Sequence, residues 1–424
     1  MTAPLRRPLL ALGVATLASC AASCARGPSQ PDEGPIRVAV IMPQSGDLGP
    51  DGQLWLKGIR MATQEVNAAG GPLPGRPIEL LVLDSRTMED VAVSEAMRAI
   101  GEEGVVAVIG DGGSGGTLAI YNEVTSNAGV PQVSCCATSP RLTEASMAAP
   151  DGERFFFRTV PSDALQSQVV GRIADDRGCT RLAILHLDDA YGGPLAAATA
   201  ADFTRRGGSV VATVPYTDGL SMYATETRMI ADANPECVAL IGYPRTAGNI
   251  LRSYYMLTSP PTVTWIGTDG LRTDTFVTEA GTALLATVQF YGAAPITQPD
   301  GPAYEDFSQR HRALFAELPG PFVSNSYDAA ALLYLGIARA QGTAGRPIMN
   351  AVRSLNTGTV VRAGELATGL AQIQREEAVN YEGASGSVDV DAYGDVRTDY
   401  EIWRVNAAGT AIDRVERVPA SELD

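Results

Sequence analysis

The sequence predicts an α/β protein with two doubly wound lobes. Two observations indicate this fold class. From residue 36 onward, short apolar runs rich in β-branched residues alternate with amphipathic stretches of helical periodicity, as expected for βαβ units whose parallel sheet is covered on both faces. The alternation restarts near residues 158–161, after a loop with few core residues at 144–153. Two similar lobes are therefore favoured over one wide sheet.

The individual elements follow from the length and pattern of each run. Continuous apolar runs of strand length predict strands at 36–42, 78–84, 105–109, 132–134, 181–187, 209–215, 238–242 and 263–266. Amphipathic runs between them predict helices at 54–69, 91–102, 117–128, 165–177, 196–206 and 225–233. Glycines at 70–71, 129 and 207–208 stand where helices should end. A later portion predicts helices at 304–318, 326–341, 348–354 and 363–374, then strands at 386–390 and 400–406.

The composition argues against several classes of function. The 424 residues include 48 acidic and 32 basic side chains, a formal net charge of -16. This balance opposes nucleic-acid binding, which depends on Lys and Arg at the phosphates. The sequence has two histidines, His186 and His311, so few imidazole ligands are available for a metal site, and no cysteines have the spacing of a metal site. No nucleophile–base pair stands out. We therefore expect no metal, no cofactor and no catalytic residue.

The N-terminus has the pattern of a bacterial lipoprotein export signal. Arg6 and Arg7 precede an apolar run at 9–17, which is too short to span a bilayer comfortably. The sequence Leu17-Ala18-Ser19-Cys20 resembles a lipobox, in which the chain is cut before the cysteine and the thiol is lipidated.

This pattern predicts a signal peptide at 1–19, lipidation of Cys20 and a flexible tether at 20–35 that is rich in Pro, Gly and small residues. The protein is then expected outside the cytoplasm, held at a bacterial membrane by its lipid alone. An ordinary signal peptide cut near Ala22 remains the alternative. No later run reaches the roughly 18 apolar residues of a membrane-spanning helix.

Candidate ligand-binding residues follow from the expected topology, because ligands of doubly wound sheets bind beyond the carboxyl ends of the strands. A glycine-rich stretch at 110–117 follows the third expected strand, opens a helix and contains Ser114. Backbone N–H groups at this position suit an anion, and the Ser114 hydroxyl adds a donor. The stretch is neither a P-loop nor a dinucleotide fingerprint. A plain flexible turn remains the alternative.

Other strand ends supply complementary groups. Residues 134–140, Ser-Cys-Cys-Ala-Thr-Ser-Pro, form a second stretch of small residues with hydroxyls, and Asp189 and Asp269 follow two later strands. Donors for an anion on one lobe and carboxylates on the other suit a zwitterion between them. Either acid alone is more often a turn or N-cap residue, so the prediction depends on the combination.

Several motifs make a family resemblance specific. They are Gly58-Ile59-Arg60, Glu65-Val66-Asn67-Ala68-Ala69-Gly70-Gly71, Gly110-Asp111-Gly112-Gly113-Ser114, Ala137-Thr138-Ser139-Pro140-Arg141-Leu142-Thr143, Phe157-Arg158-Thr159-Val160-Pro161-Ser162-Asp163, Asp189-Ala190-Tyr191-Gly192, and Gly386-Ser387-Val388-Asp389 through Gly394-Asp395. In this order and spacing they resemble type I periplasmic binding proteins. The nearest group resembled is the leucine/isoleucine/valine-binding proteins of branched-chain amino-acid ABC transporters. The resemblance implies two Rossmann-like lobes joined by a three-segment hinge, with lobe 1 at 36–160 and 295–385 and lobe 2 at 161–294 and 386–424.

The same resemblance implies roles for individual residues. In lobe 1, Ser114 and Thr138 match hydroxyls that bind the α-carboxylate and α-ammonium groups of the ligand, and Cys136 matches a residue used through its backbone. In lobe 2, the matching residues are two aromatic side chains that line the cleft and one acid that pairs with the ammonium group: Tyr191, Tyr243 and Asp269.

This chain also departs from the family pattern. Asp51 stands where relatives often carry an aromatic residue, so Trp55 or Leu48 would have to supply the apolar wall. The pair Cys135-Cys136 replaces the usual Pro and small residue. We expect recognition of the amino-acid backbone to persist while the side-chain preference changes, with Asp51, Trp55 and Asp111 as candidates for the side-chain pocket.

The doubly wound strand order that the family implies bears on the cysteines. The first and third strands of such a lobe are neighbours, and Cys179 and Cys237 each precede one of them in lobe 2. We expect a disulfide between these two residues, with two buried free thiols as the alternative. Cys135 and Cys136 are adjacent in sequence, which rarely suits a relaxed disulfide.

Together these features favour a lipid-anchored solute-binding protein that captures a small amino acid or related zwitterion for an ABC permease. We expect it to act as a monomer. A ligand-sensing receptor with the same clamshell is the alternative, because fold alone does not fix function. An enzyme is the third and weakest hypothesis.

Overall fold

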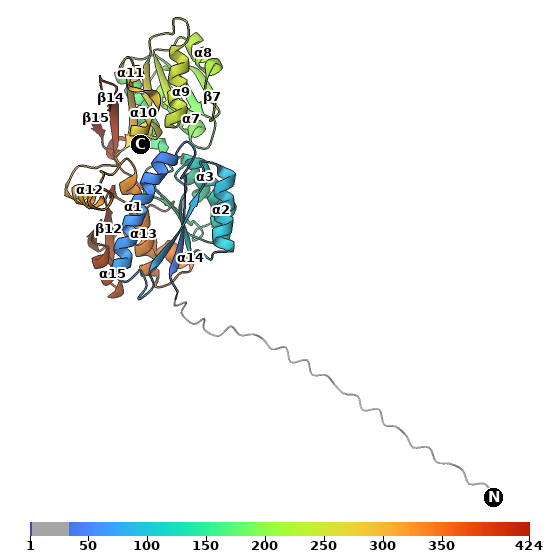
Figure 1. Cartoon of the computed structure of the whole chain (residues 1–424), viewed down its shortest axis with the longest axis vertical. Helices are drawn as coiled ribbons and strands as arrows, with labels where there is room; N and C mark the ends of the chain where they lie inside the picture. The colour runs from blue at the N-terminus through green and yellow to red at the C-terminus, as the bar shows by residue number, and fades with distance from the viewer. Residues whose placement is uncertain (2–33) are drawn as a thin grey trace. The chain divides into compact units, whose positions relative to one another are not determined.

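The computed structural model describes residue 1 and residues 34–424 (Figure 1). The predicted signal peptide, Cys20 and nearly all of the predicted tether lie outside the described residues. Residues Pro35–Asp424 form one compact unit. No helix within the described residues is both long enough and apolar enough to cross a membrane.

The first sheet contains five parallel strands in the order β2-β1-β3-β4-β5. They are β1 (Ile36–Met42), β2 (Ile78–Asp84), β3 (Ala107–Gly110), β4 (Gln132–Ser134) and β5 (Phe156–Arg158). In the centre, Val38 of β1 lies between Leu80 of β2 and Ala107 of β3. Six of the seven β1 residues are buried, which explains why this strand is a continuous apolar run.

Helices flank this sheet. They are α1 (Gly49–Ala68), α2 (Glu89–Gly101), α3 (Ser114–Ile120), α4 (Ser126–Ala128) and α5 (Pro140–Ala148), with a π-helical turn η1 (Tyr121–Thr125). Helix α2 packs against β1 and β2, whereas α1 lies beside α13 (Val323–Ala340), a helix from much later in the chain (Figure 1). The first sixteen residues of α13 are all buried, because α13 lies among α1, α14 (Gly345–Arg353) and α15 (Leu366–Gln374).

The second sheet has seven strands in the order β15-β14-β10-β9-β8-β6-β7. The parallel strands are β6 (Arg181–Leu187), β7 (Ser209–Tyr216), β8 (Cys237–Ile241), β9 (Thr264–Gly267) and β10 (Gln289–Pro295); β14 (Tyr400–Val405) and β15 (Ile412–Val418) are antiparallel to their neighbours. Its helices are α6 (Asp163–Asp176), α7 (Gly192–Arg205), α8 (Ala224–Asp232), α9 (Pro244–Tyr255), α10 (Asp274–Ala280) and α11 (Thr282–Leu285), with 3-10 turns η2 (Asp269–Leu271) and η3 (Ala420–Glu422).

The chain passes between the two halves three times. It leaves the first sheet after β5 and returns after β10 to form α12 (Pro302–Phe315), α13, α14 and α15. This return also forms a small sheet of β11 (Thr359–Arg362), β12 (Val379–Gly383) and β13 (Gly386–Ser387). The last passage runs from β13 to β14. The two-lobed, doubly wound α/β fold predicted from the sequence is thereby confirmed.

Some elements differ from the prediction. Strands β5, β10, β11, β12 and β15 were not predicted, and the strand predicted at 386–390 is limited to Gly386–Ser387. Strand β5 has three residues, and β11 is largely exposed, so neither has the long apolar run of a central strand. The helix predicted at 117–128 is divided into α3, η1 and α4. Helix α5 follows Ser139-Pro140, an N-cap and first-turn proline that the prediction overlooked.

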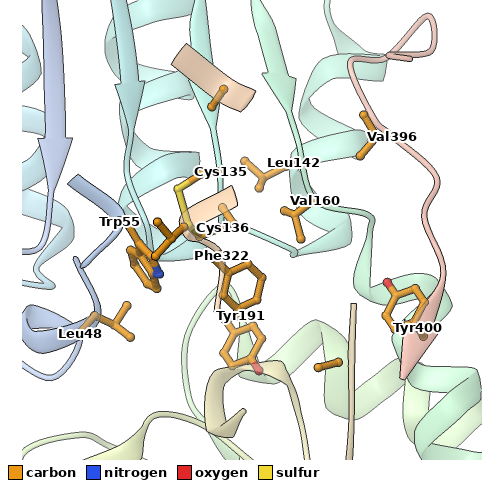
Figure 2. Close-up of a cluster of buried hydrophobic side chains, with 14 of the residues drawn as sticks. Leu48, Trp55, Cys135, Cys136, Leu142, Val160, Tyr191, Phe322, Val396 and Tyr400 are labelled. Carbon is orange, nitrogen blue, oxygen red and sulfur yellow. A yellow bond between two sulfur atoms is a disulfide. The ribbon is translucent and has the colours of Figure 1, made fainter. Parts of the chain in front are cut away.

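Two disulfides join cysteines within the described residues. One links Cys179, before β6, to Cys237 at the start of β8, with Cα atoms 6.0 Å apart; β6 and β8 are neighbours, as the expected strand order requires. The other joins Cys135 to Cys136 (Figure 2), a pairing that the sequence analysis considered unsuitable. These residues lie in a bend after β4, where side chains need not alternate between faces as they do in a strand.

Candidate functional site

A small cavity lies beyond the carboxyl ends of strands from both sheets. Its volume is about 30 Å³, which is room for two or three water molecules at roughly 10–15 Å³ each. Its lining is Leu48, Asp51, Trp55, Gly112, Ser114, Cys136, Thr138, Tyr191, Tyr243, Asp269, Gly270, Thr273 and Phe322. The structure thus brings together all six residues predicted to hold a ligand and two of the three predicted for the side-chain pocket.

Ser114 and Thr138 lie on the first-lobe wall of the cavity. Ser114 begins α3, and its Oγ accepts a 3.2 Å hydrogen bond from the backbone N–H of Ser139. The first N–H groups of a helix have no acceptor within that helix, so this loop offers donors to a ligand oxygen. The Thr138 hydroxyl donates to Oδ2 of Asp163 over 2.9 Å, which leaves its own oxygen able to accept.

A buried arginine fixes the loop that carries Thr138. The Arg158 side chain is fully buried, and Nη1 donates to the carbonyl oxygens of Ala137 and Ser139, at 3.3 and 3.1 Å. Nε lies 2.7 Å from Oδ1 of Asp395, which belongs to the last passage between the lobes. The charge of the buried guanidinium is therefore paired with Asp395. The bonds from Arg158 to the carbonyls on both sides of Thr138 fix the backbone of this loop.

Asp269 is the centre of a hydrogen-bonded network in the second lobe. Its Oδ1 accepts bonds from the Tyr191 hydroxyl at 2.7 Å and from Nε2 of Gln166 at 2.9 Å. The backbone N–H of Asp269 donates to Oε1 of Gln166, and Nε2 of Gln166 also donates to Oδ1 of Asp163. Through Asp163 the network reaches Thr138. Gln166 thus joins two buried carboxyl groups that both lie close to the cavity.

Burial raises the pKa of Asp269, and burial followed by the charge of Asp269 raises the pKa of Asp163. Hydrogen bonds from Tyr191 and Gln166 oppose the shift at Asp269 by favouring its ionised form. A cation placed beside Asp269 would oppose it further, because an opposite charge favours the carboxylate. This end of the cavity is therefore suited to an ammonium group.

Tyr191 and Tyr243 form an aromatic wall. Their rings are stacked nearly parallel, with centroids 5.6 Å apart and an interplanar angle of 9°. On the opposite lobe, Trp55 meets Phe322 edge to face at 6.2 Å, and Nε1 of Trp55 donates to the carbonyl of Pro321. Figure 2 shows Trp55, Phe322 and Tyr191 around this region, with Cys136 beside the tryptophan. The ring of Trp55 requires glycine at 112, since a Cβ there would lie 2.3 Å from it.

Asp51, in the first turn of α1, adds a second acid to the cavity wall. It is 4% exposed, and Oδ1 accepts a long bond of 3.3 Å from the Thr275 hydroxyl of α10. Burial raises the pKa of Asp51 to about 6, with a further contribution from the charge of Asp274. Within the described residues, no Lys, Arg or His lines the cavity.

Asp111 does not line the cavity, contrary to its selection as a pocket residue. Its Oδ1 accepts bonds from the backbone N–H of Gly112 and from the Ser85 hydroxyl, at 2.6 and 3.0 Å. The Asp111 carbonyl accepts from Thr117 and Ser134. Because these bonds direct the Asp111 side chain toward neighbouring loop residues and away from the cavity, we assign Asp111 the role of stabilising the conformation of this loop. Burial raises its pKa to about 7.

Comparison with known proteins gives the family. A sequence model described as periplasmic binding protein matches residues 35–410, which is most of the chain. The chain belongs to the periplasmic binding protein family. The predicted resemblance to the Leu/Ile/Val-binding type is confirmed as well.

Three similar proteins illustrate the range of this family. The chemotactic signal transduction system substrate-binding protein BasB of Halobacterium salinarum is 27% identical, over 88% of either chain. Leu/Ile/Val-binding protein homolog 3 of Brucella melitensis is 27% identical, over 78% of this chain and 89% of its own. The leucine-binding protein LivK of Thermotoga maritima shares the fold with a TM-score of 0.76 at 21% identity, covering 92% of this chain and 100% of its own.

As a member of this family, the chain is a periplasmic solute-binding protein rather than an enzyme. Among the described residues of this periplasmic binding protein, no group of three or more His, Cys, Asp or Glu side chains is placed to hold a metal ion.

Several residues at or near the site of this binding protein were not predicted from the sequence. Phe322 precedes α13 in a left-handed conformation, with φ of 63°, and reaches the cavity from a segment far away in sequence. Thr273 follows the Asp269 turn. Asp163 and Gln166 lie in the first turn of α6; Asp163 is the last residue of a motif that had been recognised, but no role was predicted for it, and Gln166 follows three residues later. Their Ser162-Asp163 start signalled a helix N-terminus, but no local pattern indicated that the helix faces the cleft.

Proposed function

We propose that the protein captures a small α-amino acid or related zwitterion between its two lobes, outside the cytoplasm, and delivers it to an ABC permease. The observation that carries this proposal is the placement of the Asp269 carboxylate across one cavity from the Ser114 and Thr138 hydroxyls, with no cationic side chain in the lining that the structure describes. The ligand's ammonium group pairs with Asp269, and its carboxylate accepts from the loop around Ser114. The fit is complementary in charge and leaves neither ligand group unpaired.

The two lobes act as a clamshell in this proposal. We assign 36–160 and 295–385 to lobe 1, and 161–294 and 386–424 to lobe 2, joined by three hinge segments. Several bonds cross between them: the Ser139 hydroxyl donates to the carbonyl of Ala190, and the Thr246 hydroxyl donates to Oδ2 of Asp47. A ligand that bridges the lobes favours this closed arrangement, and a permease that contacts both lobes recognises it.

Anchoring at Cys20 completes the proposal. A lipid on this cysteine, followed by the tether at 20–35, holds a monomeric binding protein beside its membrane partner. The supporting observations are the lipobox-like sequence Leu17-Ala18-Ser19-Cys20 and the membership of the periplasmic binding protein family.

A thermal-shift screen of the mature protein against α-amino acids, their amides and small carboxylates tests the ligand class. A true ligand at a thousandfold excess over Kd stabilises the folded state by about 4 kcal/mol. We expect shifts with a subset of L-α-amino acids and none with their N-acetyl derivatives, which lack the ammonium group. Shifts with carboxylates that lack an amino group, and with no amino acid, would replace the zwitterion by another ligand class.

A sensory role is the second candidate, because BasB, whose match covers 88% of this chain, is named as part of a chemotactic signal transduction system. Uptake of a radiolabelled ligand by cells with and without the gene distinguishes the two. Loss of uptake supports transport, whereas unchanged uptake with a lost behavioural response to the ligand supports sensing.

A further inference from the structure

Asp51 has an unusual environment for a carboxylate inside a closed cleft. It lines the cavity and is 4% exposed, yet Oδ2 has no hydrogen-bond partner among the described residues. Oδ1 has the single long bond from Thr275. A buried carboxylate usually has hydrogen bonds to both oxygens or a paired cation. The free oxygen therefore points to a partner that the protein itself does not supply.

No neighbouring charge satisfies Asp51. The groups that act on it come from the second lobe: the hydroxyls of Thr273 and Thr275, and the carboxylate of Asp274, which is repulsive. Among the described residues, the cavity contains a second acid, Asp269, and no base. Asp269 accepts short bonds from Tyr191 and Gln166, whereas Asp51 has only the 3.3 Å bond from Thr275 and the nearby hydroxyl of Thr273.

The charge count also points to the ligand. A zwitterion with an apolar side chain adds no net charge to a cavity lined by two carboxyl groups. A ligand with a second cationic nitrogen contributes one positive charge beyond its zwitterion and gives each carboxylate its own partner. An apolar side chain would instead leave the free oxygen of Asp51 buried against hydrocarbon.

The apolar and aromatic side chains that line the cavity limit the chemistry of the remaining part of the ligand. Leu48, Trp55, Phe322 and Tyr243 are buried in the described lining, where the indole Nε1 of Trp55 is occupied by its bond to the carbonyl of Pro321. These walls suit methylene groups and can also face a cation. Because the cavity of about 30 Å³ has room for only two or three water molecules, the lobes have to separate to admit an amino acid, and a short chain between the two nitrogen atoms requires the least separation.

We propose that the ligand is a short-chain diamino acid or similar α-amino acid whose side chain ends in a cationic nitrogen, and that Asp51 binds that nitrogen. The inference rests on the proposed function, because it assumes that Asp269 and the Ser114 loop hold the α-amino and α-carboxylate groups. Asp51 is then the residue that sets specificity against leucine, for which the similar LivK protein is named.

Two nearly isosteric amino acids test this assignment by calorimetry on the mature protein. L-Ornithine ends in an ammonium group where L-norleucine ends in a methyl group, and both have the same number of side-chain heavy atoms. We expect ornithine to bind about tenfold tighter or better. Asp51→Asn should remove most of this preference, and Asp51→Leu should reverse it toward norleucine, a gain that an unfolded variant cannot show. Asp274→Asn, which removes a nearby exposed charge, should keep the preference.

The possible outcomes distinguish a failure of the role proposed for Asp51 from a failure of the proposed amino-acid binding. If norleucine binds as well as ornithine, or if Asp51→Asn retains the ornithine preference, the role of Asp51 is wrong and amino-acid binding stands. If neither compound binds and no α-amino acid in the screen does, the proposed function itself fails. Tight binding of glutamine but not ornithine would overturn the cationic end group in favour of a neutral amide.

Discussion

The Tyr191 hydroxyl and Oδ1 of Asp269 lie 2.7 Å apart, and the tyrosine donates to the carboxylate. Both residues are almost fully buried, so this bond orients one carboxylate oxygen before any ligand arrives. The same oxygen receives a second bond, from Gln166. An ammonium group entering the cleft therefore meets a carboxylate that needs no rearrangement, which reduces the entropy lost on binding.

Asp269→Asn is expected to weaken amino-acid binding strongly without unfolding the protein. Asparagine keeps the size of the side chain and can still accept from Tyr191, but it carries no charge for the ligand's ammonium group. Loss of one charge-assisted bond costs about 1.5–3 kcal/mol, or roughly ten- to a hundredfold in Kd. Calorimetry measures the change, and Asp188→Asn, at an exposed position, is the control. Equal affinity in the two variants would remove Asp269 from the ligand contacts.

The buried acids predict that stability falls as the pH rises from about 4 to 7. Burial raises the pKa of Asp111 to about 7, with a smaller contribution from the charge of Asp84. The folded protein therefore retains a proton that the unfolded chain releases above its ordinary pKa of 3.8, and raising the pH favours unfolding. Each such group contributes at most about 1.4 kcal/mol per pH unit.

Asp111→Asn tests this linkage, because the amide resembles the neutral carboxyl and can still accept from Gly112 and Ser85. We expect the variant to lose less stability than the wild type between pH 5 and 8, measured by urea unfolding at each pH. Asp188→Asn should follow the wild-type curve. Parallel curves for Asp111→Asn and wild type would show that Asp111 releases its proton at an ordinary pH.

The Cys179–Cys237 disulfide is expected to stabilise the second lobe. Replacing both cysteines by alanine should lower the free energy of unfolding by about 2–4 kcal/mol and leave ligand affinity unchanged, since neither residue lines the cavity. Urea unfolding and calorimetry give the two values. Mass spectrometry of the unreduced wild type provides an independent check, because two free thiols at these positions would contradict the bond.

Cys20→Ala is expected to release the protein from the membrane fraction of cells that express the full chain. In the proposed anchoring the lipid is attached to this thiol, so the variant lacks the attachment site. Immunoblots of separated fractions measure the shift. A wild-type protein that is already found in the aqueous fraction would favour an ordinary signal peptide cut near Ala22.

Site residues at the ends of strands were easier to predict from the sequence than residues that reach the site from distant parts of the chain. Ser114, Thr138, Tyr191, Tyr243 and Asp269 follow apolar runs, and such runs end at one edge of a doubly wound sheet. Family resemblance and strand topology therefore identified the same positions, and the structure gathers them around one cavity.

The residues that were missed depend on tertiary packing. Phe322 reaches the cavity because α13 lies beside α1, a contact that no local periodicity indicates. Gln166 is important because it bridges Asp163 and Asp269 from two different elements. The bond between Cys135 and Cys136 depends on a bend after a three-residue strand. Sequence patterns describe faces of single elements, whereas these features arise where elements meet.

Arg158 gives the binding loop a mechanical connection to the hinge. Its guanidinium donates hydrogen bonds to the carbonyls on either side of Thr138 and pairs with Asp395, which lies in the segment between β13 and β14. In the proposed clamshell, a rotation of one lobe would move Asp395 and, through Arg158, the loop that carries Thr138. A substitution of Arg158 should therefore change both the rate at which the proposed cleft opens and the affinity with which it binds its ligand.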